Sequence, residues 1–214
     1  MQVLVCGAGR IATQLLQQLG ESWDVVLVDM NQERLQKATA RFSSVRQTVS
    51  GDASSPVVLD EAGVGEADYV LALTGSDAVN LAIIDHAQKR GLRAILALAH
   101  EQVEVQAFRE RRVRFILPGR LLAQHAYHFL QDPRITIHTL DMVEAEVVEI
   151  DAADHFALVG RPVSTLAHAG WQLVGLYRDG ELLFPEADMR VGKSDRLVIL
   201  GQRDVFNTVC SLME

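Results

Sequence analysis

The first part of the chain repeats one unit, which consists of a short apolar run, a turn, and a segment with the apolar spacing of a helix. The apolar runs are Val3–Val5, Val25–Val28, Tyr69–Leu73, Ala94–Ala99 and Phe115–Leu117. Each run is too short for a helix and apolar on both faces, which is typical of a strand buried within a parallel sheet. Strands and helices that alternate in this way predict an α/β fold, a doubly wound parallel sheet with right-handed crossovers.

The pattern changes after Leu117. Pro118-Gly119 indicates a break in the chain, and the segment from Arg120 to Gln131 has the spacing of a helix that ends before Asp132-Pro133. This helix has two interpretations. It packs within its own chain, which is the more common case, or it is a linker helix that swaps onto a partner subunit.

From Ile135 onward the chain carries signals of β type. The segment from Val143 to Val147 alternates between apolar and polar residues. Farther along, Val174–Tyr177 and Leu182–Phe184 flank an Asp179-Gly180 pair, which is a good hairpin signal. These patterns predict a second, smaller α+β domain.

The expected organisation therefore has three parts: residues 1–118 as the doubly wound domain, 119–134 as a connecting and dimerisation helix, and 135–214 as the small α+β domain. Acidic side chains are frequent just after the connecting helix. Three of them, Glu144, Glu146 and Glu149, are interpreted as charges that solubilise an outer strand.

Charge and composition exclude several classes of protein. The 214 residues include 20 basic and 28 acidic ones, a formal net charge of −8, which disfavours nucleic acid as a partner. The longest stretch without Asp, Glu, Lys or Arg, Pro162–Tyr177, contains too many polar residues for a membrane span. No export signal precedes Val3, so we expect a cytoplasmic protein.

The two cysteines, Cys6 and Cys210, have neither CxxC spacing nor a nearby histidine cluster. We therefore expect no metal or redox site and interpret both as small buried apolar residues.

A glycine turn follows the first apolar run directly. Gly7-Ala8-Gly9-Arg10-Ile11-Ala12 opens the first helical segment, which is the context that the dinucleotide-binding fingerprint requires. Gly7 allows the tight turn, Gly9 lets backbone amides approach a phosphate at the helix N-terminus, and Ala12 still permits close packing of helix on sheet. The expected sheet is therefore Rossmann-like.

Asp29 stands at the end of the second apolar run, twenty-two residues after Gly7. A carboxylate here can accept hydrogen bonds from both ribose hydroxyls of NAD, and it would repel the 2′-phosphate of NADP. The structural alternative is a glycine turn followed by an aspartate that caps the helix beginning near Asn31.

Two further loops fall at the carboxyl ends of predicted strands, where ligands of such sheets bind. Gly51-Asp52-Ala53 is expected to border an adenine, and Thr74-Gly75-Ser76-Asp77 to lie beneath the phosphates. Structural interpretations stay open, because Asp77 can cap a helix that begins at Ala78 and the hydroxyls of this loop can bond its amides. Arg10 is either solvated or pairs with a terminal phosphate, from its own site or from a neighbouring subunit.

The sequence lacks the groups that a dehydrogenase needs beside its cofactor. The segment after Pro133 is short for a substrate-binding domain, and the seven histidines are scattered without a pattern of nucleophile, base and orienting acid. We therefore expect a nucleotide sensor and not an enzyme. An NAD-dependent oxidoreductase that uses the same cleft is the alternative.

Motifs along nearly the whole chain carry a resemblance to a known family. In the first domain they are Val3–Ala12, Val28–Asn31, Gly51–Ser54, Ala67–Asp77 and Asn80-Leu81. In the second domain they are Leu158–Val163, Val174–Glu181 and Gly192–Val198. On these motifs the chain resembles the RCK proteins, the regulators of potassium conductance, and in particular the regulatory subunits of Trk/Ktr-type potassium uptake systems.

The resemblance implies a cytoplasmic subunit, peripheral to the inner face of the plasma membrane, that gates a membrane potassium-translocating subunit. Its lobes would form a homo-dimer through the connecting helix, dimers would assemble into a ring, and nucleotide would change the ring's conformation. A soluble gating fragment of a longer potassium channel is a further alternative. The implied ligand is an adenine nucleotide, NAD(H) or ATP/ADP. The residues expected to bind it are Gly7, Ala8, Gly9, Arg10, Ile11, Asp29, Met30, Asn31, Asp52, Ala53, Thr74 and Gly75.

Overall fold

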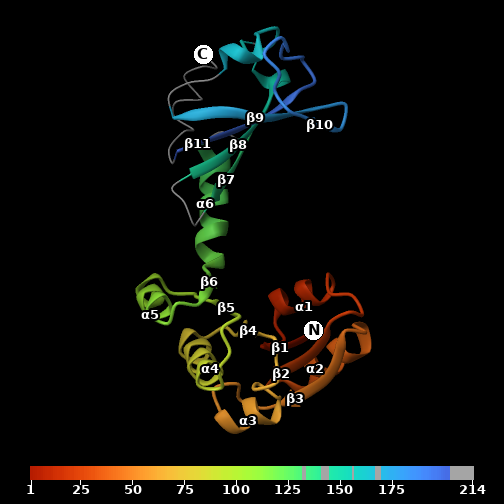
Figure 1. Cartoon of the computed structure of the whole chain (residues 1–214), viewed down its shortest axis with the longest axis vertical. Helices are drawn as coiled ribbons and strands as arrows, with labels where there is room; N and C mark the ends of the chain where they lie inside the picture. The colour runs from red at the N-terminus through yellow and green to blue at the C-terminus, as the bar shows by residue number, and fades with distance from the viewer. Residues whose placement is uncertain (132–133, 141–144, 156, 167–169, 203–214) are drawn as a thin grey trace. The chain divides into compact units, whose positions relative to one another are not determined.

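The computed structural model describes residues 1–131, 134–140, 145–155, 157–166 and 170–202. The chain forms two compact units, Met1–Arg120 (unit 1) and Leu121–Glu214 (unit 2), as Figure 1 shows. Unit 1 is built on a six-stranded sheet, and unit 2 on a five-stranded sheet.

The sheet of unit 1 is doubly wound, as the repeat predicts. Its strands are β1 (Gln2–Cys6), β2 (Asp24–Asp29), β3 (Val45–Ser50), β4 (Tyr69–Ala72), β5 (Ile95–Leu98) and β6 (Arg114–Ile116). They lie in the order β3-β2-β1-β4-β5-β6, and each neighbouring pair is parallel. The winding reverses between β1 and β4, which is where open α/β sheets bind their ligands. The predicted fold class is confirmed.

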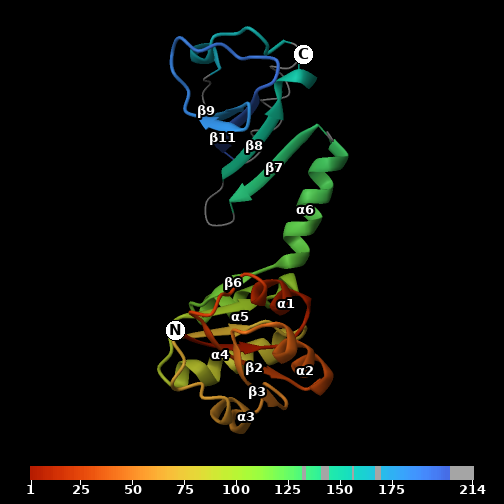
Figure 2. The ribbon, with the colours of Figure 1, turned by 90° about the vertical axis from the view of Figure 1, so that its right-hand side faces the viewer.

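The strands of unit 1 are connected by helices on both faces of the sheet (Figure 2). These are α1 (Arg10–Leu16), α2 (Gln32–Arg41), α3 (Pro56–Glu61), α4 (Asp77–Lys89) and α5 (Val105–Glu110), the last preceded by the 3-10 turn η1 (Gln102–Glu104). Val3 and Val5 of β1 share a buried cluster with Leu16 of α1, whereas Leu4 shares one with Ile83 of α4. Successive residues of β1 thus enter different cores, which explains the uninterrupted apolar runs.

The sequence pattern does not predict β3, the strand at one edge of the sheet. Only Val45 and Val49 of this strand are buried, and its other four residues are exposed. An edge strand has one neighbour and needs no continuous apolar run, so its sequence resembles that of a loop.

α6 (Pro118–Gln131) begins two residues before the predicted start at Arg120. Proline suits the first turn of a helix because the N–H that it lacks would have no partner there, so Pro118 starts the helix instead of breaking the chain. The side chains of Leu122, Phe129 and Leu130 are 71, 60 and 80% exposed. None of the helices in the described segments is long and apolar enough to cross a lipid bilayer.

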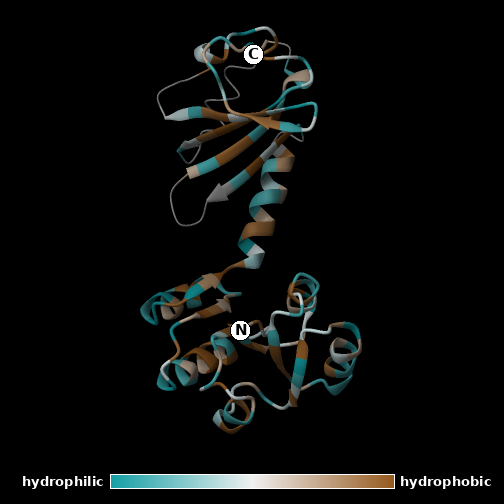
Figure 3. Cartoon of the chain, turned by 45° about the vertical axis from the view of Figure 1, so that its right-hand side comes forward, coloured by the Kyte–Doolittle hydropathy of each residue, from teal (hydrophilic) through white to brown (hydrophobic). Residues whose placement is uncertain are grey.

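Unit 2 contains an antiparallel sheet. Its strands are β7 (Ile135–Leu140), β8 (Ala145–Asp151), β9 (Trp171–Arg178), β10 (Glu181–Leu183) and β11 (Arg196–Gln202), in the order β10-β9-β11-β8-β7. Asp179 and Gly180 join β9 to β10 with φ angles of 53° and 86°, so this hairpin is the one the Asp-Gly pair predicts. Figure 3 shows apolar residues along the inner strands of both sheets.

The interpretation of the glutamates as solubilising charges on an outer strand is wrong for Glu146. β8 lies between β11 and β7, and its alternation turns Glu146 toward the core side, where it is 5% exposed. Glu149 is directed to the opposite side, 3.5 Å from Nε2 of His138 and 3.8 Å from Nη1 of Arg196. Glu144 lies outside the described residues.

Cys6 is fully buried in the core of unit 1, and burial raises the pKa of its thiol to about 12. A thiol in this environment stays protonated and unreactive, as expected of a small core residue. Cys210 lies outside the described residues.

Candidate nucleotide-binding site

The turn after β1 can be formed only by glycine at position 7. Gly7 has a φ of +102°, and a Cβ atom there would lie 2.8 Å from the carbonyl oxygen of Leu73 at the end of β4. Its N–H donates a 2.7 Å hydrogen bond to the carbonyl oxygen of Val28 in β2. The turn is therefore pressed against both neighbours of β1, and a side chain has no room.

Gly9 has a different role from Gly7. It precedes α1 with an ordinary φ of −79°, and a Cβ atom there would meet nothing within 4 Å. Neither strain nor crowding requires glycine here. The open space over its backbone leaves room for a ligand to approach the chain closely.

Asp29, the last residue of β2, fixes the glycine turn. Its Oδ2 accepts a 2.6 Å hydrogen bond from the N–H of Ala8, and its Oδ1 accepts a 2.7 Å bond from the N–H of Asn31. The structural alternative, in which Asp29 caps the next helix, is wrong, because Asn31 caps α2 through a 3.1 Å bond from the N–H of Arg34 to its Oδ1.

A cleft of about 250 Å³ opens at the carboxyl ends of β1, β2, β3 and β4. It brings together eight of the twelve residues expected to bind nucleotide: Gly7, Gly9, Asp29, Met30, Asp52, Ala53, Thr74 and Gly75. The cleft is also lined by Val28, Arg34, Gly51, Leu73, Ser76 and Val79. Four loops that are distant in the sequence, those after β1, β2, β3 and β4, therefore meet in one place.

The other four expected residues lie elsewhere. Ala8 and Arg10 line a depression that adjoins the cleft at Gly9. Ile11, in the first turn of α1, is 43% exposed and lines neither cavity. Asn31 also lines neither, because its side chain is directed to the start of α2 as a cap.

Asp52 and Ala53 follow β3 and border the same cleft. The N–H and the hydroxyl of Ser54 donate bonds of 2.9 and 2.8 Å to Oδ1 of Asp52, and these bonds lower the pKa of its carboxyl. Ala53 is buried in the core beside α3 while still lining the cleft. Its small side chain therefore forms part of the cleft floor.

The loop after β4 is organised by Asn80, a fully buried residue of α4. Its Oδ1 accepts bonds from the N–H of Thr74 at 3.1 Å and from the hydroxyl of Thr74 at 2.7 Å. Its Nδ2 donates to the carbonyl oxygens of Thr74 and Leu98 at 3.2 and 2.8 Å. One amide thus sets the position of Thr74 at the cleft and ties it to the end of β5.

The start of α4 differs from the predicted cap by one residue. Ser76 caps the helix, since its Oγ accepts a 3.4 Å bond from the N–H of Val79. Asp77 is the first helical residue, and its carboxylate accepts bonds of 2.8 and 2.9 Å from the N–H groups of His100 and Glu101. Asp77 therefore joins the cleft loop to the loop that follows β5.

Arg34 is a cleft residue that the sequence interpretation missed. It lies in the first turn of α2, five residues after Asp29. No sequence pattern indicates this role, because spacing alone does not give the direction of a side chain that leaves α2.

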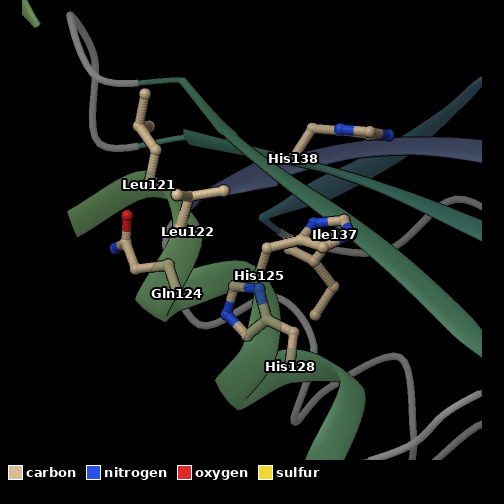
Figure 4. A pocket seen from close by; sticks show the side chains of 7 residues that line it. All are labelled: Leu121, Leu122, Gln124, His125, His128, Ile137 and His138. Carbon is tan, nitrogen blue, oxygen red and sulfur yellow. The ribbon is translucent and has the colours of Figure 1, made fainter. Parts of the chain in front are cut away.

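A second cavity, of about 270 Å³, lies within unit 2 between α6 and β7. It is lined by Leu121, Leu122, Gln124, His125, His128, Ile137 and His138, so three histidines that are scattered in the sequence line one cavity. Figure 4 shows the ring of His125 directed from α6 toward Ile137 of β7. In the part of the chain that the structure describes, no three histidines, cysteines or carboxylates are grouped to hold a metal ion.

Comparison with known proteins decides the family. Residues 3–117, more than half of the 214 residues, match the sequence model of the TrkA-N domain. The chain belongs to the TrkA-N family. This stretch contains the whole six-stranded sheet apart from its first residue, together with the cleft.

The TrkA-N chain is similar to curated proteins of potassium uptake systems. It is 28% identical to the Trk system potassium uptake protein TrkA of Azorhizobium caulinodans, over 97% of this chain and 46% of that protein. It is 25% identical to the TrkA homolog of Pyrococcus abyssi, over 100% of this chain and 98% of that protein. The chain thus spans about half of the first relative and nearly all of the second.

Solved structures share the two-unit fold of this TrkA-N protein. The GsuK RCK domain superposes with a TM-score of 0.66 at 17% identity and covers 99% of this chain and 47% of that one. The GsuK channel bound to NAD has the same TM-score at 16% identity, over 100% of this chain and 39% of that one. The resemblance to the RCK proteins is confirmed, and at these identities the structural likeness shows the fold.

Proposed function

We propose that this TrkA-N protein is a nucleotide-sensing regulatory subunit that gates a membrane potassium transporter or channel. The observation that carries the proposal is the cleft of unit 1, where the glycine turn, Asp29 and the Thr74 loop converge. The relatives are named as potassium uptake proteins, and a potassium uptake system is therefore what this cleft would regulate.

The ligand that best suits the cleft is an adenine nucleotide, either NAD(H) or ATP/ADP. Asp29 keeps a free lone pair on each carboxylate oxygen beyond its two backbone bonds, so it can accept the ribose hydroxyls. Gly9 leaves the backbone open to a phosphate, and Ala53 and Met30 offer apolar contact to a base. The NAD found in the GsuK channel supports this choice of ligand.

The proposed assembly is a homo-dimer that forms a higher ring beneath the membrane partner. Its support is α6, where Leu122, Phe129 and Leu130 expose most of their apolar surface in the single chain. Large apolar side chains grouped on one exposed helix are typical of an interface. This supports the swapped linker helix over a helix packed in its own chain. In the proposed assembly the protein lies in the cytoplasm, at the inner face of the plasma membrane.

The regulatory effect follows from linkage. A nucleotide changes the conformational equilibrium of the pore only to the extent that it binds one conformation of the ring more tightly than another. The hydrogen bonds of Asp77 to His100 and Glu101 connect the cleft loop to the elements that lead toward α6. The protein acts in this scheme without catalysis.

The test is a thermal-shift panel with ATP, ADP, AMP, NAD, NADH and NADP, followed by potassium flux in cells that lack the gene. A ligand at 100 times its Kd should stabilise the protein by about 2.7 kcal/mol. A nucleotide that shifts the wild type, and alters flux only when the protein is present, supports the proposal. Hydride transfer to a substrate in the same cleft would instead establish an oxidoreductase.

A further inference from the structure

Exposed cations gather at one corner of unit 1, where β5 and β6 begin. The connecting helices of a parallel sheet run back along its strands, so α4 and α5 end at the edge where these two strands start. The nucleotide cleft lies at the other edge, where the strands end. Five cations of this corner are exposed, and we call them the basic corner: Lys89, Arg93, Arg109, Arg112 and Arg114.

The pairing of β5 with β6 brings three of these arginines together. Leu96 of β5 is the partner of Arg114, the first residue of β6. Because the two strands are parallel, Arg93 lies level with Arg111, the neighbour of Arg112. Three exposed guanidinium groups therefore leave two adjacent strand starts.

The other two cations are connected to the same turn. The amide of Gln88, which precedes Lys89, donates a 2.8 Å bond to the carbonyl oxygen of Arg111, and the N–H of Arg112 donates a 3.0 Å bond to the carbonyl oxygen of Arg109. Lys89 and Arg109 lie in the last turns of α4 and α5, where a cation suits the helix dipole. Their positions have this local explanation, whereas the other three have none.

Arg93, Arg112 and Arg114 have no partner of opposite charge. Among the residues that the structure describes, none of the three forms a salt bridge. Most carboxylates of the adjoining elements are bonded elsewhere: Asp60 to His86 and Arg90, Asp68 to the N–H of Gln2, Asp85 to Arg111, and Glu110 to the amide of Gln106. Glu66, before β4, is the remaining exposed acid, so the corner keeps an excess of positive charge.

Arg112 stands where the other helices of this sheet have glycine. It is the second residue after α5, with a φ of 54°, a conformation that costs little only for glycine. The second residues after α3 and α4 are Gly63 and Gly91, with φ angles of 70° and 90°. Glycine is the usual residue at this position because it relieves the strain. The arginine keeps the strain and adds an exposed charge, which points to a role for its side chain.

We propose that the basic corner docks unit 1 on the anionic surface of a lipid bilayer. The inference rests on the proposed function, in which the protein lies at the inner face of the plasma membrane. Anionic lipids give that leaflet a negative potential, and each Arg or Lys near it strengthens binding about fivefold. Guanidinium groups bind lipid phosphates without a shaped pocket. Nucleic acid, the other polyanion, is disfavoured by the net charge of −8.

The experiment is co-sedimentation of the full chain with vesicles of phosphatidylcholine, with and without phosphatidylglycerol. The test variant combines Arg112→Gln with Arg114→Gln. The control combines Arg41→Gln with Arg46→Gln, which removes the same charge at the opposite end of the same sheet edge, where Arg46 is paired with Asp24. On phosphatidylglycerol vesicles the test variant should bind at least tenfold more weakly than the wild type, and the control should change less than about twofold. Raised salt should abolish the binding.

A further variant separates docking from a structural role. Arg112→Gly places glycine in the conformation that favours it, so its Tm should equal or exceed that of the wild type. Its affinity for the anionic vesicles should nevertheless fall about fivefold. A lower Tm with unchanged vesicle binding would assign Arg112 to the fold and overturn its docking role.

The remaining outcomes are distinct. Equal binding to the two vesicle types, or a test variant that binds like the control, overturns the docking surface. Tighter binding of duplex DNA than of anionic vesicles also overturns it and assigns the corner to nucleic acid. A chain that binds nucleotide and alters potassium flux without binding vesicles keeps the proposed function and loses the docking surface. Vesicle binding by a chain that leaves flux unchanged supports the surface and contradicts the regulatory role.

Discussion

The N–H of Ala8 donates a 2.6 Å hydrogen bond to Oδ2 of Asp29, and this bond joins the turn after β1 to the end of β2. In the sequence the two residues are elements of a ligand-binding pattern. In the structure Asp29 is also what holds the turn in shape before any ligand arrives. Because each carboxylate oxygen can accept a second hydrogen bond, the structural and binding roles are compatible.

Replacement of Asp29 is therefore expected to affect stability as well as binding. Asp29→Ala leaves the N–H groups of Ala8 and Asn31 without their acceptor and should lower the free energy of unfolding by about 1–3 kcal/mol. Asp24→Ala, at the other end of β2, removes only an exposed pair with Arg46 and should cost less than about 1 kcal/mol. Urea denaturation followed by circular dichroism measures both, and equal losses would contradict the role of Asp29.

The two glycines of the turn should respond differently to alanine. Gly7→Ala forces a side chain into a positive φ and against Leu73, which should cost about 3 kcal/mol or more. Gly9→Ala meets no neighbour and should cost about 1 kcal/mol or less, while weakening nucleotide binding at least tenfold.

Thermal denaturation measures the loss of stability in both glycine variants, and calorimetric titration measures their loss of nucleotide affinity. A Gly9→Ala protein that binds nucleotide as tightly as the wild type would show that the ligand does not approach this backbone.

Loss of the Asn80 amide should loosen the loop after β4. Asn80→Ala removes the partner of the buried carbonyl oxygen of Leu98 and of three half-buried groups of Thr74, and it should lower the free energy of unfolding by about 3 kcal/mol. The control on the same helix is Gln88→Ala, which removes one exposed bond to the carbonyl oxygen of Arg111 and should cost about 0.5–1.5 kcal/mol. Hydrogen exchange at the Thr74 amide should accelerate in the first variant only. Unchanged protection there would argue against the positioning role of Asn80.

An ion pair of unit 2 that joins a buried carboxylate to a partly exposed arginine offers a further test. Arg178 donates two 2.8 Å bonds to Asp195, whose side chain is 0% exposed. Arg178→Ala leaves this charge without its partner and should cost about 3 kcal/mol. Arg196→Ala breaks an exposed pair with Asp151 and the longer contact with Glu149, and it should cost about 1 kcal/mol or less. Fluorescence of the buried Trp171 reports unfolding of unit 2 in both variants.

The same pair predicts a dependence on pH. Burial raises the pKa of Asp195, but bonds from Arg178 and from the N–H of Gly192 outweigh burial, and the net pKa lies below its ordinary value of 3.8. A carboxyl with a lowered pKa in the folded state stabilises the fold above its unfolded pKa, and that stability is lost as pH falls through the folded value.

In Arg178→Ala burial remains while the guanidinium is gone, so the pKa of Asp195 should be higher in the variant than in the wild type. The stability difference between the two proteins should therefore shrink as pH falls through the pKa of Asp195 in the variant. Urea titrations at several pH values measure it, and a difference that stays constant down to about pH 3 would show that Asp195 is not the group responsible.

Local chemistry explains which parts of this structure the sequence predicts. The central strands of unit 1, the glycine turn and the Asp179-Gly180 hairpin each depend on neighbouring residues, and their patterns are correspondingly clear. β3 was missed because an edge strand needs few apolar residues. Glu146 was misinterpreted because alternation does not reveal which side of a strand faces the core.

The candidate site was predicted to a similar extent. Eight of twelve expected residues line the cleft because the carboxyl ends of parallel strands must meet at one edge of the sheet. The contribution of Arg34 depends on the direction of a side chain leaving α2, which spacing alone does not give. The bonds of Asp77 to His100 and Glu101 connect loops on either side of a helix and a strand, and no local pattern contains them.

The polar character of β3 has a consequence for the behaviour of the protein in a crowded cell. Arg46, Gln47 and Thr48 project from the middle of this strand into solvent, and β6, at the opposite edge, is only three residues long. Neither border offers a long apolar template on which another chain could add a strand. Unit 1 is thereby protected from edge-to-edge aggregation at high local concentration.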